Sequence, residues 1–279
     1  MTNQDIPRTP RGDSASTRLA YVLSGVLLVA LGLVAVLVLS AGADPVTGRP
    51  TSNATSTKPV KLSSLVESTT HTRLDAAPAD PNPQQATKGW IVRPTKVIAL
   101  RVSPGGRAFG KVGPKQIGET WLPVIDQRDQ WTRVLLPSKP NGSTGWLRSA
   151  HLKRTLTPYL IRVHLSSMRL ALFYHGREMN SWTIGIGKPD TPTPIGRTFI
   201  LGSIVDPNQT YSPIILPLGA HSETLDSFGG GPGTVAIHTW PTTDVLGTAS
   251  SNGCIRVPQE ALNQLTRVPL GTLVLVDQH

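Results

Sequence analysis

The sequence predicts a mainly β protein in which an N-terminal transmembrane helix precedes two β-rich domains with one or two short helices. Three observations lead to this prediction. Residues 19–43 form an uncharged run rich in Leu and Val. Short apolar runs separated by Gly- and Pro-rich turns fill residues 89–155, and the same pattern returns over residues 156–279. A length of 279 residues suits about two compact domains plus extra segments.

The uncharged run at residues 19–43 is long enough to cross a membrane. As a helix it rises roughly 37 Å, against about 30 Å for a bilayer core. The alternative is a cleaved signal peptide ending at Ala41-Gly42-Ala43, but the apolar part of a signal peptide is usually shorter, about 7–15 residues. Three arginines in residues 1–18 favour a single-pass protein with a cytoplasmic N-terminus. All later residues are then extracytoplasmic, which excludes nucleic acid as a partner.

Residues 44–88 are rich in Pro, Ser, Thr, Ala and Asp and lack a periodic apolar pattern. Such a segment buries too little apolar surface to offset its ordering entropy. We therefore expect a disordered linker that tethers the folded domains to the membrane.

The first β-rich domain is expected over residues 89–155. Apolar runs at 97–102, 121–124, 131–136 and 145–147 alternate with turn residues, a spacing that favours a small β-barrel. The pattern W-x-x-V-x-x-P…G-W-L, which begins at Trp131 and includes Trp146, resembles a bacterial SH3-like domain. The two tryptophans have two interpretations, core packing and ligand stacking, and core packing is favoured.

The second β-rich domain is expected over residues 156–279. Strands are predicted over residues 159–165, 169–174, 182–187, 199–201, 235–237 and 272–276. A helix is predicted with Pro258 at its first position and Ala261, Leu262 and Leu265 on one face. Residues 206–233 are long for a plain connection and favour a lid or a substrate-binding loop.

A single cysteine, Cys254, excludes internal disulfides and four-cysteine zinc sites. His238 precedes it by sixteen residues and directly follows the predicted strand 235–237. A cysteine nucleophile works as a thiolate, and a nearby imidazole can take its proton. Gly253 permits a tight turn that aims backbone N–H groups at one oxyanion. Taken alone, the pair is weak evidence, and an inert buried cysteine is the better explanation.

The motifs around this pair carry a family resemblance. His238 followed by S-x-G-C-I-R at 251–256, with fifteen residues between His238 and Cys254, resembles the signature of the L,D-transpeptidase family, whose catalytic unit is the YkuD-like domain. The segment TPTPIGRTF at 191–199 is similar to the family's TPTPxGxF element, and GIGK at 185–188 also matches. The resemblance covers residues 158–278.

The resemblance implies a mostly β catalytic domain that cross-links peptidoglycan without a metal or an organic cofactor. The family attacks the L,D bond between a diamino acid and the terminal D-Ala of a donor stem, and releases D-Ala. A side-chain amine of an acceptor stem then resolves the thioester as a 3→3 cross-link. By this resemblance Cys254 is the nucleophile and His238 the general base, oriented by the backbone carbonyl of Thr239. The backbone N–H groups of Gly253 and Cys254 are the implied oxyanion donors.

The chain departs from the family pattern at two positions. Many members carry His where this chain has Asn252, and some carry Asn where it has Arg256; Asn252 cannot serve as a second base. Substrate contact and a structural role are equally weighted for Ser251 and Arg256, and Trp240 either packs or binds substrate. Two other functions stay open, an L,D-carboxypeptidase and a non-catalytic cell-wall-binding protein.

The formal net charge of +10 is concentrated in the first domain. Residues 89–155 hold twelve basic and three acidic side chains, whereas residues 156–279 hold seven and eight. This asymmetry favours an anionic wall polymer or a phospholipid surface as the neighbour of the first domain.

Overall fold

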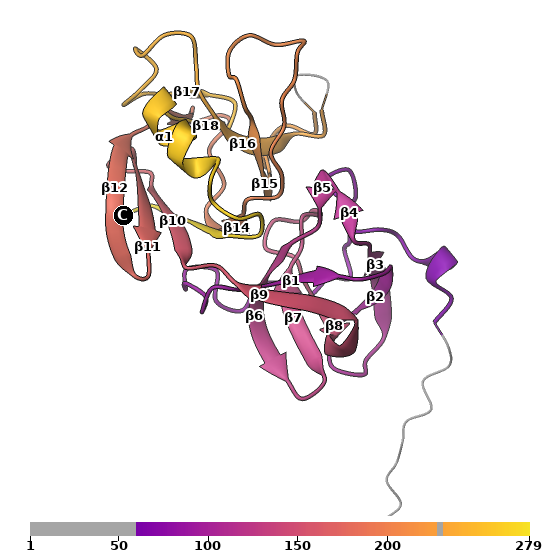
Figure 1. Cartoon of the computed structure of the whole chain (residues 1–279). Helices are drawn as coiled ribbons and strands as arrows, with labels where there is room; N and C mark the ends of the chain where they lie inside the picture. Colours follow the sequence, from indigo (N-terminus) through magenta and orange to yellow (C-terminus); the bar gives the residue numbers. More distant parts are fainter. Residues whose placement is uncertain (1–59, 228–230) are drawn as a thin grey trace, which may run out of the picture. The chain divides into compact units, whose positions relative to one another are not determined.

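The structure, a computed structural model, describes residues 60–227 and 231–279 (Figure 1). The predicted cytoplasmic tail, the predicted transmembrane helix and the linker up to residue 59 lie outside the described residues. Within the described ranges, no helix is long and apolar enough to cross a membrane.

Residues 90–156 form one seven-stranded sheet in the order β3-β2-β8-β7-β6-β1-β9. Every pairing in it is antiparallel. The strands are β1 (Trp90–Pro94), β2 (Ile98–Arg101), β3 (Ala108–Val112), β6 (Leu122–Arg128), β7 (Trp131–Leu135), β8 (Thr144–Arg148) and β9 (Leu152–Leu156). Two short strands, β4 (Lys115–Gln116) and β5 (Gly118–Glu119), pair beside it, and a 3₁₀ turn, η2 (Ser149–His151), precedes β9. The expected short strands are confirmed, and the SH3-like resemblance stays a prediction.

The two tryptophans of this domain are covered by arginines. Trp146 is buried and Trp131 half-buried. Arg148 lies over the ring of Trp131 at 4.8 Å, and Arg128 lies over the ring of Trp146 at 5.3 Å. Burial of Trp146 agrees with the core-packing interpretation, whereas Trp131 is only half-buried and its ring is covered by an exposed arginine.

The disordered linker predicted for residues 44–88 is corrected over residues 60–88, here called the N-terminal strap. The strap begins with the 3₁₀ turn η1 (Leu62–Ser64) and then follows the edge of the first domain. The N–H of Ser68 donates to the carbonyl of Lys111 at 2.8 Å, and that of Leu74 to the carbonyl of Lys139 at 2.8 Å. The Leu74 side chain is buried in the core of the first domain. Composition missed this order because the hydrogen-bond partners lie elsewhere in the chain.

The second domain contains a five-stranded sheet in the order β12-β11-β10-β19-β14. Its strands are β10 (Tyr159–His164), β11 (Arg169–Tyr174), β12 (Arg177–Thr183), β14 (Gly196–Phe199) and β19 (Leu273–Asp277). Strand β19 pairs parallel with β10 and antiparallel with β14, so the C-terminal strand lies inside the sheet between these two.

A three-stranded sheet, β15-β16-β18, shares its apolar core with the five-stranded sheet. Its strands are β15 (Leu216–His221), β16 (Thr234–His238) and β18 (Ile255–Arg256); a separate pair joins β13 (Ile186–Gly187) to β17 (Ala249–Ser251). Strand β15 falls inside the long loop expected over residues 206–233, which is therefore two shorter connections around a strand. The sequence did not predict this strand because all six residues of β15 are buried, and so apolar and polar residues do not alternate along it.

The predicted helix is present as α1 (Gln259–Leu265). Ala261, Leu262 and Leu265 are buried on one face, as expected. Pro258, predicted at the first helical position, instead precedes the helix with extended backbone, at φ −66° and ψ 156°. The helix packs against β12, where Asn180 donates to Gln264 at 2.7 Å.

Candidate active site

Cys254 and His238 come together because the strands that carry them are paired. His238 is the last residue of β16, and Cys254 directly precedes β18. The two strands run parallel with Ile237 opposite Ile255, and the N–H of Val257 donates to the carbonyl of His238 at 2.9 Å. Both side chains are buried, with exposed fractions of 6% for His238 and 8% for Cys254. The expected position of His238 at a strand end is confirmed.

The tautomer of His238 follows from its hydrogen bond. Its Nδ1 lies 2.7 Å from the carbonyl oxygen of Thr239, which can only accept, so Nδ1 carries the proton. Nε2 is then the unprotonated nitrogen, with a lone pair free to accept a proton. The carbonyl of Thr239 therefore has the orienting contact that the family resemblance implies.

Burial keeps the cysteine and the histidine electrically neutral. It raises the pKa of the Cys254 thiol, against a smaller lowering by a backbone hydrogen bond from Ala236 and by the charge of Arg256. Burial also lowers the pKa of His238, more than the hydrogen bond to Thr239 raises it, and Arg256 lowers it further. Near neutral pH the resting site thus holds a thiol and an imidazole rather than an ion pair.

An aromatic residue that sequence reasoning missed packs on the imidazole. The rings of Tyr211 and His238 meet edge to face with their centroids 4.9 Å apart, and Trp240 lies 5.6 Å from Tyr211. Burial raises the pKa of Tyr211, and so do the Cys254 thiolate, once that thiol ionises, and the Asp206 carboxylate. Nothing in its local sequence marks Tyr211, because it lies in the loop before β15.

The loop that carries Tyr211 is bonded to the end of β16. The N–H of Thr239 donates to Ser212 Oγ at 3.0 Å, and its hydroxyl donates to the carbonyl of Tyr211 at 3.0 Å. These two bonds fix Thr239 from both its backbone and its side chain, and so fix the carbonyl that orients His238.

Ser251 ties together the turn around Cys254. Its hydroxyl donates to the carbonyl of Cys254 at 2.6 Å and accepts the N–H of Gly253 at 3.1 Å. Ser251 is 2% exposed, so these contacts match the structural interpretation of that residue. Gly253 has φ +110°, a conformation that L side chains rarely adopt, which confirms the need for glycine in this turn.

The expectation that the N–H groups of both Gly253 and Cys254 serve as oxyanion donors is corrected for Gly253. Its N–H is already bonded to Ser251, so it is not a free donor in this structure. Among the described residues, the N–H of Cys254 donates to no acceptor. Cys254 thus supplies the one free backbone N–H of the two that were expected.

Two threonines of the TPTP segment hold the same turn from its other side. Thr193 Oγ1 donates to the carbonyl of Gly253 at 3.0 Å and accepts the N–H of Gly187 at 2.9 Å. Thr191 Oγ1 donates to the carbonyl of Ser251 at 3.1 Å. Both threonines are buried. The motif was noted in the sequence only as a resemblance, and the structure gives it this physical role.

Three further expected residues lie at the rim of the site. Arg256 stacks over the ring of Trp240 at 4.0 Å, and its Nη1 donates to Ser250 Oγ at 3.0 Å. Burial lowers the pKa of Arg256, and its Nε is buried without a partner among the described residues. Trp240 is 39% exposed and Asn252 is also exposed. The structure thus places all three beside Cys254 and His238, with Trp240 and Asn252 open to solvent.

No group of three or more His, Cys, Asp or Glu side chains within residues 60–227 and 231–279 has the arrangement to hold a metal ion.

Comparison with known proteins points to one family. The family model of the L,D-transpeptidase catalytic domain, YkuD, matches residues 158–276. The YkuD protein of Bacillus subtilis is 30% identical over 122 residues, which are 43% of this chain and 67% of that protein. Among solved structures, L,D-transpeptidase 3 of Mycobacterium tuberculosis aligns at a TM-score of 0.39 and 14% identity, over 56% of this chain and 97% of that one. The catalytic domain of the E. faecium L,D-transpeptidase aligns at a TM-score of 0.34 and 24% identity, over 44% and 98%. With the family model on its second domain and a relative at this identity, the chain belongs to the L,D-transpeptidase (YkuD) family.

Proposed function

We propose that this chain is a peptidoglycan L,D-transpeptidase that forms 3→3 cross-links through a thioester on Cys254. The observation that carries the proposal is the pairing of β16 with β18. It sets Cys254 beside the strand that ends in His238, and the hydrogen bond to Thr239 leaves Nε2 of His238 as the proton acceptor. A buried thiol and a base of fixed tautomer are the two groups that nucleophilic acyl transfer requires.

In the first half-reaction His238 Nε2 takes the proton from Cys254 Sγ as sulfur attacks the carbonyl carbon of the donor's diamino acid. The S–C bond forms, the C–N bond to D-Ala breaks, and the imidazolium returns the proton to the departing amine. Free D-Ala and a thioester remain. The N–H of Cys254 can donate to the oxyanion of the tetrahedral intermediate, because no protein acceptor uses it among the described residues.

In the second half-reaction the side-chain amine of an acceptor stem attacks the thioester carbon. The C–N bond forms, the C–S bond breaks and His238 transfers the amine's proton back to sulfur. This step regenerates the neutral thiol and imidazole, which are the resting forms that burial favours. Water in place of the amine gives an L,D-carboxypeptidase.

The test follows the products of full-length protein incubated with disaccharide-tetrapeptides by mass spectrometry, with Cys254→Ala as the control. A dimer that lacks one D-Ala supports transpeptidation, whereas tripeptide alone indicates a carboxypeptidase. If neither product forms and no carbapenem adduct appears on Cys254, a non-catalytic wall-binding protein is the better description. We expect Cys254→Ala to abolish turnover with the fold retained, and full activity in that variant contradicts the mechanism.

We also propose that residues 19–43 anchor the chain in the cell membrane with the folded domains facing the wall, where the first domain binds an anionic wall polymer. Cross-strand neighbours support the second point. Arg148 lies opposite Trp131 and Arg133 opposite Trp146, so guanidinium and indole groups alternate on one sheet face. Stacking on indoles orders guanidinium groups in advance and lowers the entropy cost of binding anions.

Polymer binding is tested with soluble polyphosphate, and phospholipid vesicles containing phosphatidylglycerol form the second arm. Arg128→Gln with Arg148→Gln should weaken polyphosphate binding, and raising the salt concentration should weaken binding by the unaltered protein. Arg177→Gln is the control: it also removes an exposed arginine, but from β12 in the second domain. Binding that is equal in all three proteins contradicts the proposal, and binding to vesicles alone assigns the face to lipid.

A further inference from the structure

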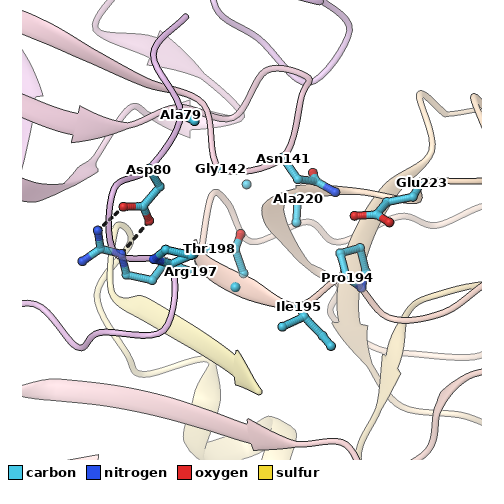
Figure 2. Close-up of a pocket in the computed structure, with 13 residues that line it drawn as sticks. Ala79, Asp80, Asn141, Gly142, Pro194, Ile195, Arg197, Thr198, Ala220 and Glu223 are labelled. Atoms are coloured by element: carbon cyan, nitrogen blue, oxygen red, sulfur yellow. Dashed lines mark hydrogen bonds and ion pairs between the residues drawn. The ribbon is translucent and has the colours of Figure 1, made fainter. Parts of the chain in front are cut away.

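The N-terminal strap is joined to the second domain by a buried ion pair between Asp80 and Arg197 (Figure 2). Arg197 Nε donates to Asp80 Oδ2 at 2.7 Å, and Nη2 donates to Oδ1. The side chains are 2% exposed for Asp80 and 4% for Arg197. Two parallel N–H···O bonds fix direction as well as distance, so this contact sets the position of Arg197 closely.

The first domain holds Asp80 in place from the other side. The N–H of Asp80 donates to the carbonyl of Gly142 at 2.8 Å. Two residues earlier, the carbonyl of Pro78 accepts the N–H of Thr144, also at 2.8 Å. The backbone of Asp80 is therefore fixed to the first domain, whereas its carboxylate is bonded to the second.

Arg197 is connected to the turn that carries the nucleophile through a short segment. Thr193, four residues before Arg197, is the threonine that donates to the carbonyl of Gly253. Pro194, which lies between them, has a fixed φ and limits how far the two residues can move independently. The segment that receives the ion pair at one end thus holds the Cys254 turn at the other.

A cavity of about 220 Å³ borders this segment on the side of the strap. Figure 2 shows Pro194, Ile195 and Thr198 facing it, with Asp80 and Arg197 at one end. The Thr198 hydroxyl is buried there without a partner among the described residues. Arg197 Nη1 also donates to the carbonyl of Gln85 in the strap at 3.1 Å, so the ion pair and this bond together fix the segment to the strap beside the open space.

We propose that Asp80 is a positioning residue for the Cys254 turn, acting through Arg197 and Thr193. The inference rests on the proposed thiol chemistry of Cys254. It makes the strap and the first domain part of the scaffold of the active site, although both lie outside the segment that matches the family model.

The test compares full-length protein with its Asp80→Asn variant by two measurements. The first is the kcat for D-Ala release, which should fall by about tenfold because small displacements of a catalytic group are costly, while KM stays close to its original value. The second is the pH midpoint for alkylation of Cys254 by iodoacetamide, which should move down toward that of an ordinary thiol as the turn loosens. A merely structural role would lower stability without moving this midpoint in folded protein.

Asp226→Asn is the matched control, because Lys139 and Asp226 also join the two domains, at 2.9 Å, without touching the 191–197 segment. It should change neither kcat nor the midpoint. In a Thr193→Val background, Asp80→Asn should cause no further loss. Arg197→Lys keeps both charges of the ion pair but loses the two parallel hydrogen bonds to Asp80. The same two measurements are made on this variant if Asp80→Asn fails to fold.

Folded Asp80→Asn with an unchanged midpoint and an unchanged kcat overturns the positioning role, and so does a loss that adds fully to that of Thr193→Val. Alkylation needs no peptidoglycan substrate. A protein that releases no D-Ala but shows the shifted midpoint therefore contradicts the proposed function while supporting the role of Asp80.

Discussion

His238 Nδ1 and the carbonyl oxygen of Thr239, the next residue in the chain, form a hydrogen bond of 2.7 Å. A residue that binds the backbone of its own neighbour has its ring orientation set by one peptide unit. The residue that carries this carbonyl is itself held by Ser212, whose Oγ accepts the N–H of Thr239. The orientation of the base therefore depends on the loop before β15 as well as on β16.

The first prediction concerns the reactivity of Cys254 toward iodoacetamide. Burial raises the pKa of its thiol and lowers that of His238, so the resting pair is neutral. We expect slow alkylation at pH 7 and a rate that rises about tenfold per pH unit until the thiol ionises, because only the thiolate reacts. The measurement is adduct formation on native protein by mass spectrometry. A rate already at its maximum at pH 6 would instead indicate a preformed ion pair.

The second prediction concerns Ser251→Ala. The substitution leaves the N–H of Gly253 and the carbonyl of Cys254 without their partner inside a buried turn. We expect the free energy of unfolding to fall by about 1–3 kcal/mol, the usual cost of buried polar groups left unpaired. Urea unfolding measures it. Ser251→Thr keeps the hydroxyl and should recover most of the loss, and an unchanged Ser251→Ala midpoint contradicts the proposed tie.

The third prediction separates backbone strain from its effect on the site. Gly253→Ala and Gly176→Ala both put a side chain at positive φ, 110° and 76° respectively. Each should lose about 1–2 kcal/mol of stability. Only Gly253→Ala should also slow D-Ala release, because Gly176 lies in the turn between β11 and β12, away from Cys254. Equal activity in the two variants would show that the conformation of Gly253 does not matter to the reaction.

Much of the site could be predicted from the sequence because its parts are local. Cys254, His238 and Thr239 lie in two short segments, and strand β11 was predicted with its observed bounds because its residues are followed directly by the His175-Gly176 turn. A structural role was one of the two interpretations of Ser251, but the sequence did not predict that its hydroxyl takes the N–H of Gly253, since that bond depends on the rotamer of a side chain.

The order in the strap could not be predicted for a different reason. Composition describes what a segment can bury by itself, but the contacts of Leu74 and Asp80 are made to Lys139 and Arg197, far along the chain. Tyr211 was missed in the same way, because its contact with His238 exists only once β15 pairs with β16.

The fourth prediction concerns stability and pH. Burial lowers the pKa of both His238 and His221 in the folded protein. The N–H at Nε2 of His221 donates to the carbonyl of Thr70 at 2.8 Å, and this bond raises the pKa of His221 less than burial lowers it. The unfolded chain, with ordinary pKa values near 6.5, binds more protons below that pH than the folded protein does. The contribution of these two histidines to the free energy of unfolding should therefore be greatest above about pH 7 and should fall as the pH drops below 6.5.

Each buried histidine can contribute a slope of at most about 1.4 kcal/mol per pH unit in that window. Urea unfolding at pH 7.5 and 5.5 measures the total. Removing one histidine should reduce the difference between the two pH values; His221→Gln keeps a donor for Thr70, and His238→Asn keeps one for Thr239. If the histidines titrated normally in the folded state, neither buried variant would change the pH dependence, because a group with equal pKa values in both states contributes no slope.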